Sequence, residues 1–237
     1  MRLARFQPIG RFGAASLSAC LLVANAAHAA YPMNTDDAGI VDAKACRLES
    51  WVKRNPDSTE FWAQPACNFT GNLELTVGGA ITRAAGRFQT TGVVMQGKTL
   101  LKTMDPNGWG IGLAAGTINH PQAAARDWYA YAPASFSFKD DAVLVHANLG
   151  WLREGETRRN RLTWGLGSEL RLTERSWLIA ETFGQNQGKA FHQFGLRYWL
   201  VPDRIQIDAT YGNRNGGGSG ERWFSIGFRL LSAPFLL

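Results

Sequence analysis

The feature that most constrains this chain is a two-residue alternation of apolar and polar side chains that recurs along most of its length. In one such segment, Phe194, Leu196, Tyr198 and Leu200 alternate with other side chains, among them Arg197. This period is typical of a β-strand with two different faces. From residue 45 onward no long stretch has apolar residues at helical spacing, and we expect twelve strands, near 45–54, 60–69, 72–83, 89–103, 108–119, 128–138, 142–153, 160–173, 176–184, 191–201, 204–212 and 222–231.

The links between these segments indicate how the strands are connected. Short links such as 70–72 and 105–108 alternate with longer polar or Gly-rich links such as 119–127 and 213–221. An even number of strands with alternating link lengths is typical of outer-membrane barrels. The sequence therefore predicts an all-β fold, a single antiparallel up-and-down transmembrane β-barrel of about twelve strands. The alternative is a secreted β-sandwich, which the aromatic residues near strand ends disfavour: Trp109, Trp128, Trp151, Tyr198 and Tyr211.

The first residues have the layout of a secretory signal peptide: basic residues, a short apolar run, and small residues before Ala30. We expect residues 1–29 to be removed, with cleavage near Ala29. Residues 30–44 then form a periplasmic N-terminal segment, and residues 45–237 form the barrel. A lipoprotein cleavage site before Cys20 is the alternative. Removing 1–29 takes away three Arg residues and no acid, so the formal charge falls from +6 to +3.

The polar face of each strand predicts the contents of the lumen. In a transmembrane barrel the apolar face meets lipid and the polar face lines the interior. We expect Arg197 to lie opposite Asp208, and Glu169 opposite Glu181 with an arginine between them. These charges either fill the barrel as structural ion pairs or filter solutes by charge. The candidate lumen and selectivity residues are Glu49, Glu74, Lys98, Glu169, Arg171, Glu181, Arg197, Asp208 and Arg229.

The register of the first two strands carries a further prediction. Pairing Lys53 with Glu60 places Cys46 directly opposite Cys67. Directly opposed strand residues lie close enough for a disulfide after a modest adjustment. In an oxidising compartment an even pair of cysteines is expected to be bonded. We therefore predict a Cys46–Cys67 disulfide near the periplasmic rim; two inert buried thiols are the alternative.

Motifs for catalysis are sparse. The sequence has no Gly-x-Ser-x-Gly elbow, no zinc-spaced His pair and no phosphate-binding Gly loop after a strand. We expect no enzyme activity, no metal and no cofactor. The enzyme alternative is an outer-membrane lipid hydrolase, since Ser135 is expected to oppose His146; His120 and His192 lie in or near links. Such a pair without a third, orienting group is typically structural.

Several motifs resemble one known family. The segment 31–51 is similar to the start of the MetA-pathway of phenol degradation family of bacterial outer-membrane proteins, and segments 70–80, 178–188, 194–212 and 223–231 add further matches. The matching positions at the start are Pro32, Thr35, Asp36, Asp37, Gly39 and Glu49. The resemblance implies an outer-membrane barrel linked to transport of hydrophobic or aromatic compounds.

We thus expect a channel or uptake component for small solutes, aromatic or hydrophobic ones included, in the outer membrane of a Gram-negative bacterium. The expected partners are outer-membrane lipid and lipopolysaccharide, the barrel-assembly machinery and a small-molecule solute, with no nucleic acid; the sequence assigns no oligomeric state. The alternative is a non-conducting structural or surface-interaction barrel whose lumen is closed by salt bridges. Before the first strand, Asp36 and Asp37 are expected to cap a turn or bind a cation, in the periplasm or in the barrel mouth.

Overall fold

Twelve β-strands and one short 3₁₀ helix make up the regular structure of residues 33–236, the part of the chain that the computed structural model describes. The predicted signal peptide, residues 1–29, lies outside the described residues. The strands are β1 (Cys46–Arg54), β2 (Ser58–Asn68), β3 (Glu74–Ala84), β4 (Arg87–Lys102), β5 (Trp109–His120), β6 (Ala125–Phe138), β7 (Val143–Arg153), β8 (Asn160–Arg171), β9 (Ser176–Gln185), β10 (Phe191–Val201), β11 (Ile205–Arg214) and β12 (Trp223–Leu231), and the helix is η1 (Ser219–Glu221).

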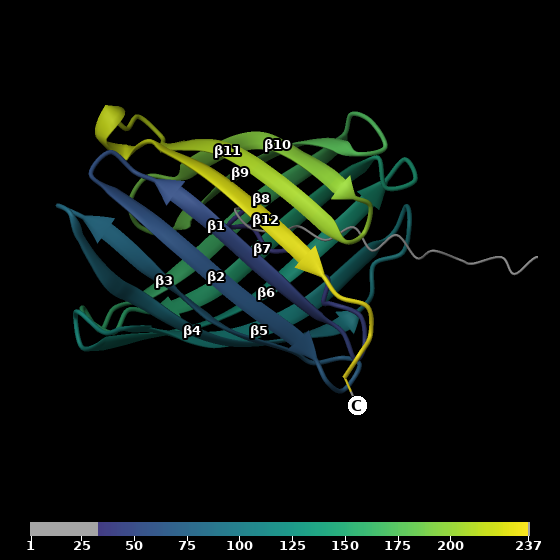
Figure 1. Ribbon diagram of the computed structural model, residues 1–237, viewed down its shortest axis with the longest axis horizontal. Coiled ribbons are helices and arrows are strands. Elements are labelled where there is room, and N and C mark those ends of the chain that lie inside the picture. The colour runs from purple at the N-terminus through teal and green to yellow at the C-terminus, as the bar shows by residue number, and fades with distance from the viewer. Residues whose placement is uncertain (1–32, 237) are drawn as a thin grey trace, which may run out of the picture.

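The strands close into one barrel, in which each strand pairs antiparallel with its sequence neighbours and β1 pairs with β12 (Figure 1). The predicted fold class is therefore confirmed. Closure pairs the backbone of both edge strands, as a spanning β-structure requires. Within residues 33–236 no helix is long and apolar enough to cross a membrane. We call the end where β1 begins and β12 finishes the terminal end, and the opposite end the far end.

Two predicted registers are confirmed. β1 and β2 pair Lys53 with Glu60 and Cys46 with Cys67. β10 and β11 pair Arg197 with Asp208. Near the terminal end the pairing of β10 with β11 shifts by one residue. Val201, and not Leu200, therefore lies opposite Ile205, the first residue of β11. The shift follows from the turn, because the N–H of Arg204 donates to the carbonyl of Val201 and closes the turn one residue later than strict alternation predicts.

The predicted pairing of Glu169 with Glu181 is wrong. Glu169 lies opposite Ile179, and Glu181 lies opposite Gly167. The turn sets this register, because the hydroxyl of Thr173 accepts hydrogen bonds from the N–H groups that follow it and closes a tight link at 172–175. A hydroxyl turn of this kind fixes the pairing of both flanking strands. The two carboxylates are therefore two positions apart along the wall and do not face each other.

The expected alternation of link lengths holds only in the second half of the chain: from 139–142 onward each far-end link is longer than the terminal-end links next to it, whereas 55–57 and 85–86 are shorter than 69–73 and 103–108. The far-end links are 55–57, 85–86, 121–124, 154–159, 186–190 and 215–222, and the terminal-end links are 69–73, 103–108, 139–142, 172–175 and 202–204. Several polar segments that were expected as loops continue the strand ladders, as at the start of β6, which begins at Ala125. Backbone pairing therefore extends beyond the segments in which the apolar alternation is visible.

The two faces of the wall are as predicted. On β3, the side chains of Leu75, Val77 and Ile81 are about half exposed on the outside, and Glu74 is fully buried inside. This inside-out distribution is typical of a barrel whose outer face meets lipid. The aromatic residues expected near strand ends are all exposed large side chains: Trp109, Trp128, Trp151, Tyr198 and Tyr211.

Candidate functional site

A first group of buried charges lies inside the barrel on β1, β3 and β12. Arg47 binds two carboxylates: its Nη1 lies 3.3 Å from Oε1 of Glu49, and its Nη2 lies 2.8 Å from Oε1 of Glu74. Arg229 Nε lies 3.6 Å from the same oxygen of Glu49. All four side chains are at most 7% exposed. Buried charges are tolerated only when they are paired in this way.

A second group of charges lies on β8, β10 and β11. Arg197 Nη1 lies 2.5 Å from Oε2 of Glu169, and its Nε lies 2.8 Å from Oδ1 of Asp208. The amide of Gln206 donates to the other oxygen of Asp208 at 2.8 Å. One guanidinium therefore holds two acids, and this replaces the expected pair of opposed glutamates.

The structure places most of the predicted lumen residues inside. Those that are buried are Glu49, Glu74, Lys98, Glu169, Glu181, Arg197, Asp208 and Arg229. Arg171 shares the inward face of β8 with Glu169, but its side chain is exposed at the end of the strand, where its guanidinium lies 5.5 Å from the ring centroid of the buried Trp177. Arg171 pairs with Trp177 at the last position of the β8–β9 ladder, so it lies at the mouth of the barrel and not among the buried charges.

Residues 33–44, which we call the plug, precede β1. Residues 33–41 of the plug lie inside the barrel, with Met33, Thr35 and Val41 among the buried side chains, and residues 42–44 are exposed. The wall binds the plug through its backbone. Glu181 accepts hydrogen bonds from the N–H groups of Asn34 (2.8 Å) and Thr35 (2.7 Å). Glu74 accepts one from the N–H of Val41 at 2.9 Å. The segment therefore occupies the interior of the barrel.

The two aspartates of the plug bind a wall cation. Lys98 Nζ lies 2.8 Å from Oδ2 of Asp36 and 3.3 Å from Oδ1 of Asp37. The same oxygen of Asp37 accepts a hydrogen bond from the N–H of Gly39 at 2.7 Å, which is the turn-capping role that was expected. The hydroxyl of Tyr131 donates to Asp36 at 2.7 Å. Among residues 33–236 no group of three or more His, Cys, Asp or Glu side chains could hold a metal ion.

Two glycines of β8 leave the space that the plug fills. A Cβ added at Gly165 would lie 2.6 Å from Oγ1 of Thr35, and one added at Gly167 would lie 2.8 Å from Cε of Met33. Both distances are shorter than real Cβ contacts. Side chains at these positions would therefore compete with the plug for the lumen.

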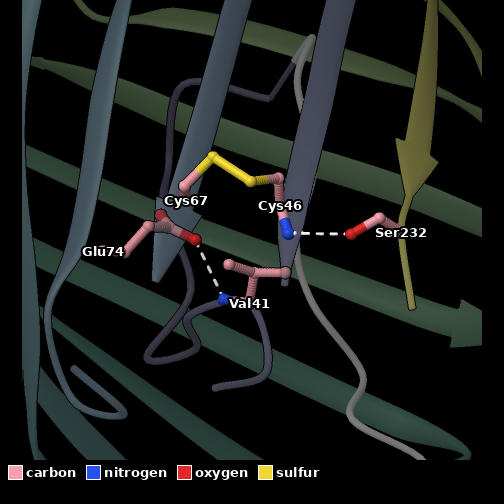
Figure 2. Close-up of a disulfide and its surroundings, with 5 residues drawn as sticks. All are labelled: Val41, Cys46, Cys67, Glu74 and Ser232. Atoms are coloured by element: carbon pink, nitrogen blue, oxygen red, sulfur yellow. Dashed lines mark hydrogen bonds between the residues drawn. A yellow bond between two sulfur atoms is a disulfide. The ribbon is translucent and has the colours of Figure 1, made fainter. Parts of the chain in front are cut away.

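A disulfide joins the strands next to the point where the plug becomes β1 (Figure 2). Cys46 and Cys67 are bonded, as the register predicted. The N–H of Cys46 donates to Oγ of Ser232 at 2.9 Å, and the amide of Asn68 donates to the carbonyl of Val41 at 2.9 Å. The disulfide thus lies close to the contacts that tie the plug, the first two strands and the C-terminal segment together.

The predicted contact between Ser135 and His146 is present, and a third group orients it. Ser135 Oγ lies 2.8 Å from Nδ1 of His146, and Nε2 of His146 lies 3.2 Å from Oε1 of Glu169. The serine oxygen also accepts the N–H of Ala38 at 2.7 Å. All three side chains of this chain face the lumen and are at most 3% exposed. The arrangement therefore connects the plug to the second charge group on the lumen side of the wall.

Beside the plug, toward the far end, lies a partly open cavity of about 600 Å³, which we call the chamber. The plug residues Met33, Asn34, Thr35 and Asp36 form part of its lining. Inward-facing aromatic side chains line much of the rest: Trp51, Trp62, Tyr129, Tyr131, Phe183, Phe191 and Trp223. The aromatic girdle expected from the sequence lies on the outer face and leaves out most of this inner set, although the members of the inner set alternate in phase with the buried charges.

Solved structures with this fold are porins and other outer-membrane proteins. The chain is similar to the KdgM porin, with 11% sequence identity over 78% of this chain and 98% of that one, and a TM-score of 0.59. It is similar to the NanC porin, with 11% identity over 78% and 98% of the two chains and a TM-score of 0.58. Outer membrane protein Omp33 of Acinetobacter baumannii has 9% identity over 78% and 96%, with a TM-score of 0.51. These similarities show that the chain has the antiparallel β-barrel fold of these outer-membrane proteins.

The family is shown by the sequence itself. A family model described as "Uncharacterised conserved protein UCP029691" matches residues 17–231, which is most of the chain, and the protein belongs to this family. No curated protein matches the sequence.

Proposed function

We propose that the protein is an outer-membrane channel or uptake barrel for small solutes, whose passage is closed by the plug and opens when the plug moves. The observation that carries this proposal is the chamber lying beside a plug that is held in the lumen by hydrogen bonds, ion pairs and side-chain packing, all of them non-covalent. Such contacts are reversible, whereas a lumen filled by wall side chains alone has no mobile element. The far end is then the external side, and the terminal end faces the periplasm.

Other observations support parts of this proposal. One solved structure with this fold is described as the KdgM porin in complex with disordered oligogalacturonate, which supports solute passage as a role. The resemblance to the MetA-pathway of phenol degradation family supports aromatic or hydrophobic solutes. The layout of residues 1–29 supports export, and the apolar outer face supports contact with outer-membrane lipid, lipopolysaccharide and the assembly machinery.

Planar-bilayer recordings test the channel. The mature chain is expected to be closed for most of the recording, and deletion of residues 33–41 is expected to give sustained conductance. Gly165→Val should act in the same direction without shortening the chain, because the added side chain occupies the space of Thr35. The matched control is Gly97→Val, where an added Cβ meets Leu75 at an ordinary 3.7 Å. A folded deletion variant that stays electrically silent would contradict the proposal.

Ion selectivity tests the role of the inward charges. In the variant without residues 33–41, Arg197→Gln removes a cation from the lumen wall. Rings of charged side chains set the preferred ion in pores. The reversal potential in a salt gradient should therefore shift toward cation selectivity, measured on barrels whose folded mobility on a gel matches that of the parent. An unchanged reversal potential would remove Arg197 from selectivity.

The second candidate function is a non-conducting structural or surface-interaction barrel. The observation that favours it is the saturation of the lumen near the terminal end, where Arg197 pairs with Glu169 and Asp208 while Lys98 holds the plug. Silence of both the parent and the folded deletion variant in the same recordings would support it. The proposal gives no catalytic role to Ser135 or His146, so Ser135→Ala and His146→Ala should leave any lipid hydrolysis unchanged.

A further inference from the structure

The chamber has two sets of aromatic rings in contact, one a stacked pair and the other a stacked pair with a third, tilted ring. Trp51 and Trp62 are stacked with centroids 5.2 Å apart and planes 4° apart. A second cluster joins Phe183, Phe191 and Trp223, with centroid separations of 5.5, 6.0 and 6.4 Å. These side chains come from β1, β2, β9, β10 and β12, so they line several sides of one cavity. A lining of this kind favours a flat apolar ring as the ligand.

The acids of the chamber are already occupied. Asp36 binds Lys98, and Glu49 binds Arg47. Glu60 accepts hydrogen bonds on both oxygens, one from the amide of Asn55 at 2.7 Å and one from the indole N–H of Trp62 at 2.8 Å. These carboxylates therefore have partners that keep them from binding a cationic ligand.

Two of the cations that line the chamber have no carboxylate partner among residues 33–236. Lys53 Nζ lies 4.7 Å from the ring centroid of Trp223, and within residues 33–236 neither Lys53 nor Lys189 forms an ion pair with a carboxylate. Arg214 also lines the chamber and lies over the ring of Phe191 at 5.5 Å, although Glu221 pairs with it. The charge that is available to a ligand is therefore positive, and it lies on the faces of the aromatic rings.

Two amides that line the chamber already use their carbonyl oxygens, which leaves fewer acceptors for the hydroxyls of a sugar. Gln193 donates to Glu181 at 2.6 Å and accepts from the indole of Trp223 at 3.1 Å. The carbonyl oxygen of Gln96 accepts from the hydroxyls of Tyr129 and Tyr131 at 3.0 and 3.2 Å. A saccharide would need free partners for several hydroxyls, because unpaired buried hydroxyls are costly. An aromatic ring needs none.

We propose that the chamber is a binding site for a small aromatic carboxylate, whose ring packs among the aromatic side chains while its carboxylate pairs with Lys53. This inference rests on the proposed function and names the solute class of the same lumen. The cavity of about 600 Å³ is in the range of sites for small molecules. The carboxylate supplies an ion-pair partner for Lys53, which lies opposite Glu60 in the β1–β2 register but forms no ion pair with it. The ring supplies the apolar surface that distinguishes the ligand from a simple anion.

Binding of benzoate to the full mature chain in detergent micelles, measured by titration calorimetry, tests this site. We expect saturable binding with one benzoate per chain. Benzyl alcohol, which lacks the charge, and cyclohexanecarboxylate, which lacks the aromatic ring, should each bind at least about fivefold more weakly. Glucuronate should not compete. Equal binding of benzyl alcohol and benzoate, or tighter binding of glucuronate, would overturn the proposal.

Two variants locate the site. Lys53→Met should weaken benzoate binding about fivefold or more and leave benzyl alcohol unchanged. Trp62→Leu should weaken both ligands. The matched control is Lys102→Met, because Lys102 also lies 4.7 Å from a tryptophan ring, that of Trp109, but near the terminal end and outside the chamber lining. Unchanged benzoate binding in a folded Lys53→Met variant would overturn the assignment.

The benzoate-binding experiment and the conductance experiment can fail independently. Saturable benzoate binding to a barrel that is electrically silent with and without the plug would uphold the site and contradict the channel. Conductance of the plug-deleted barrel together with no benzoate binding to the intact chain would uphold the channel and overturn the site.

Discussion

At Arg197 a single guanidinium separates two buried carboxylates, those of Glu169 and Asp208. Arg197→Leu leaves both acids in the wall without their cation, so we expect the free energy of unfolding to fall by about 3–5 kcal/mol. Arg171→Leu is the control, because Arg171 is exposed and its loss should cost less than about 1 kcal/mol. Urea unfolding of both variants in detergent micelles gives the comparison, and equal stabilities would contradict the assigned role of Arg197.

At Gly212 the constraint is the volume of the side chain. A Cβ at this inward position of β11 would lie 2.2 Å from the ring of Trp223, which is itself buried. Gly212→Ala should therefore displace that ring toward the chamber and lower the free energy of unfolding by about 1–3 kcal/mol. At Gly220 no atom lies within 4 Å of an added Cβ, so Gly220→Ala should be neutral in the same urea titration. A stable Gly212→Ala variant would show that the tryptophan has room to move.

At the scale of elements, the disulfide is the covalent link between the first hairpin and the root of the plug. Cys46 and Cys67 are 21 residues apart, and their bond limits the conformational freedom of the unfolded chain. Breaking the bond should therefore lower the free energy of unfolding by about 2–4 kcal/mol. The barrel should still close, because the backbone ladders of β1 with β2 and β12 remain. Unfolding midpoints with and without reductant measure this difference, and the Cys46→Ser/Cys67→Ser double variant should not respond to reductant.

How far sequence determines the elements is seen by comparing two hairpins. For β1 and β2, opposed cysteines and opposed charges agree on one register, and it was predicted correctly. For β8 and β9 the register depends on the hydroxyl of Thr173 within the turn, which apolar alternation does not report. Alternation assigns a side chain to a face, whereas turn chemistry assigns its partner across the strands.

The plug was only partly predictable for a related reason. Its capping aspartate was expected, but its place deep in the lumen was not, because it has no periodic pattern of its own. The signal lay elsewhere in the sequence, in two inward glycines of β8, Gly165 and Gly167, whose missing side chains leave room for Thr35 and Met33. A glycine pair on the polar face of a barrel strand therefore indicates that something other than the wall fills the lumen at that level.

At the scale of the whole molecule, the outward row should follow the depth of the bilayer. Leu166 lies at the middle of β8 and is 51% exposed, whereas Leu172 lies just beyond the end of that strand and is 52% exposed. Arginine at the midplane of a barrel costs roughly 2–4 kcal/mol and near the interface roughly 0–1 kcal/mol. When the barrel is refolded into liposomes, we expect Leu166→Arg to lower the free energy of unfolding by more than Leu172→Arg. Equal costs would argue that the apolar band does not span hydrocarbon.

The hydrogen bonds between the wall and the plug backbone influence which substitutions the plug can accept. Glu181, Glu74 and Ser135 bind peptide N–H groups, which every residue except proline supplies. These hydrogen bonds depend on the spacing of the N–H groups along the peptide and not on the side chains of the residues that carry them. The plug can therefore accept many substitutions at its uncharged positions. An inserted residue would shift its N–H groups away from the wall side chains that bind them, and a proline at one of these positions would remove an N–H group.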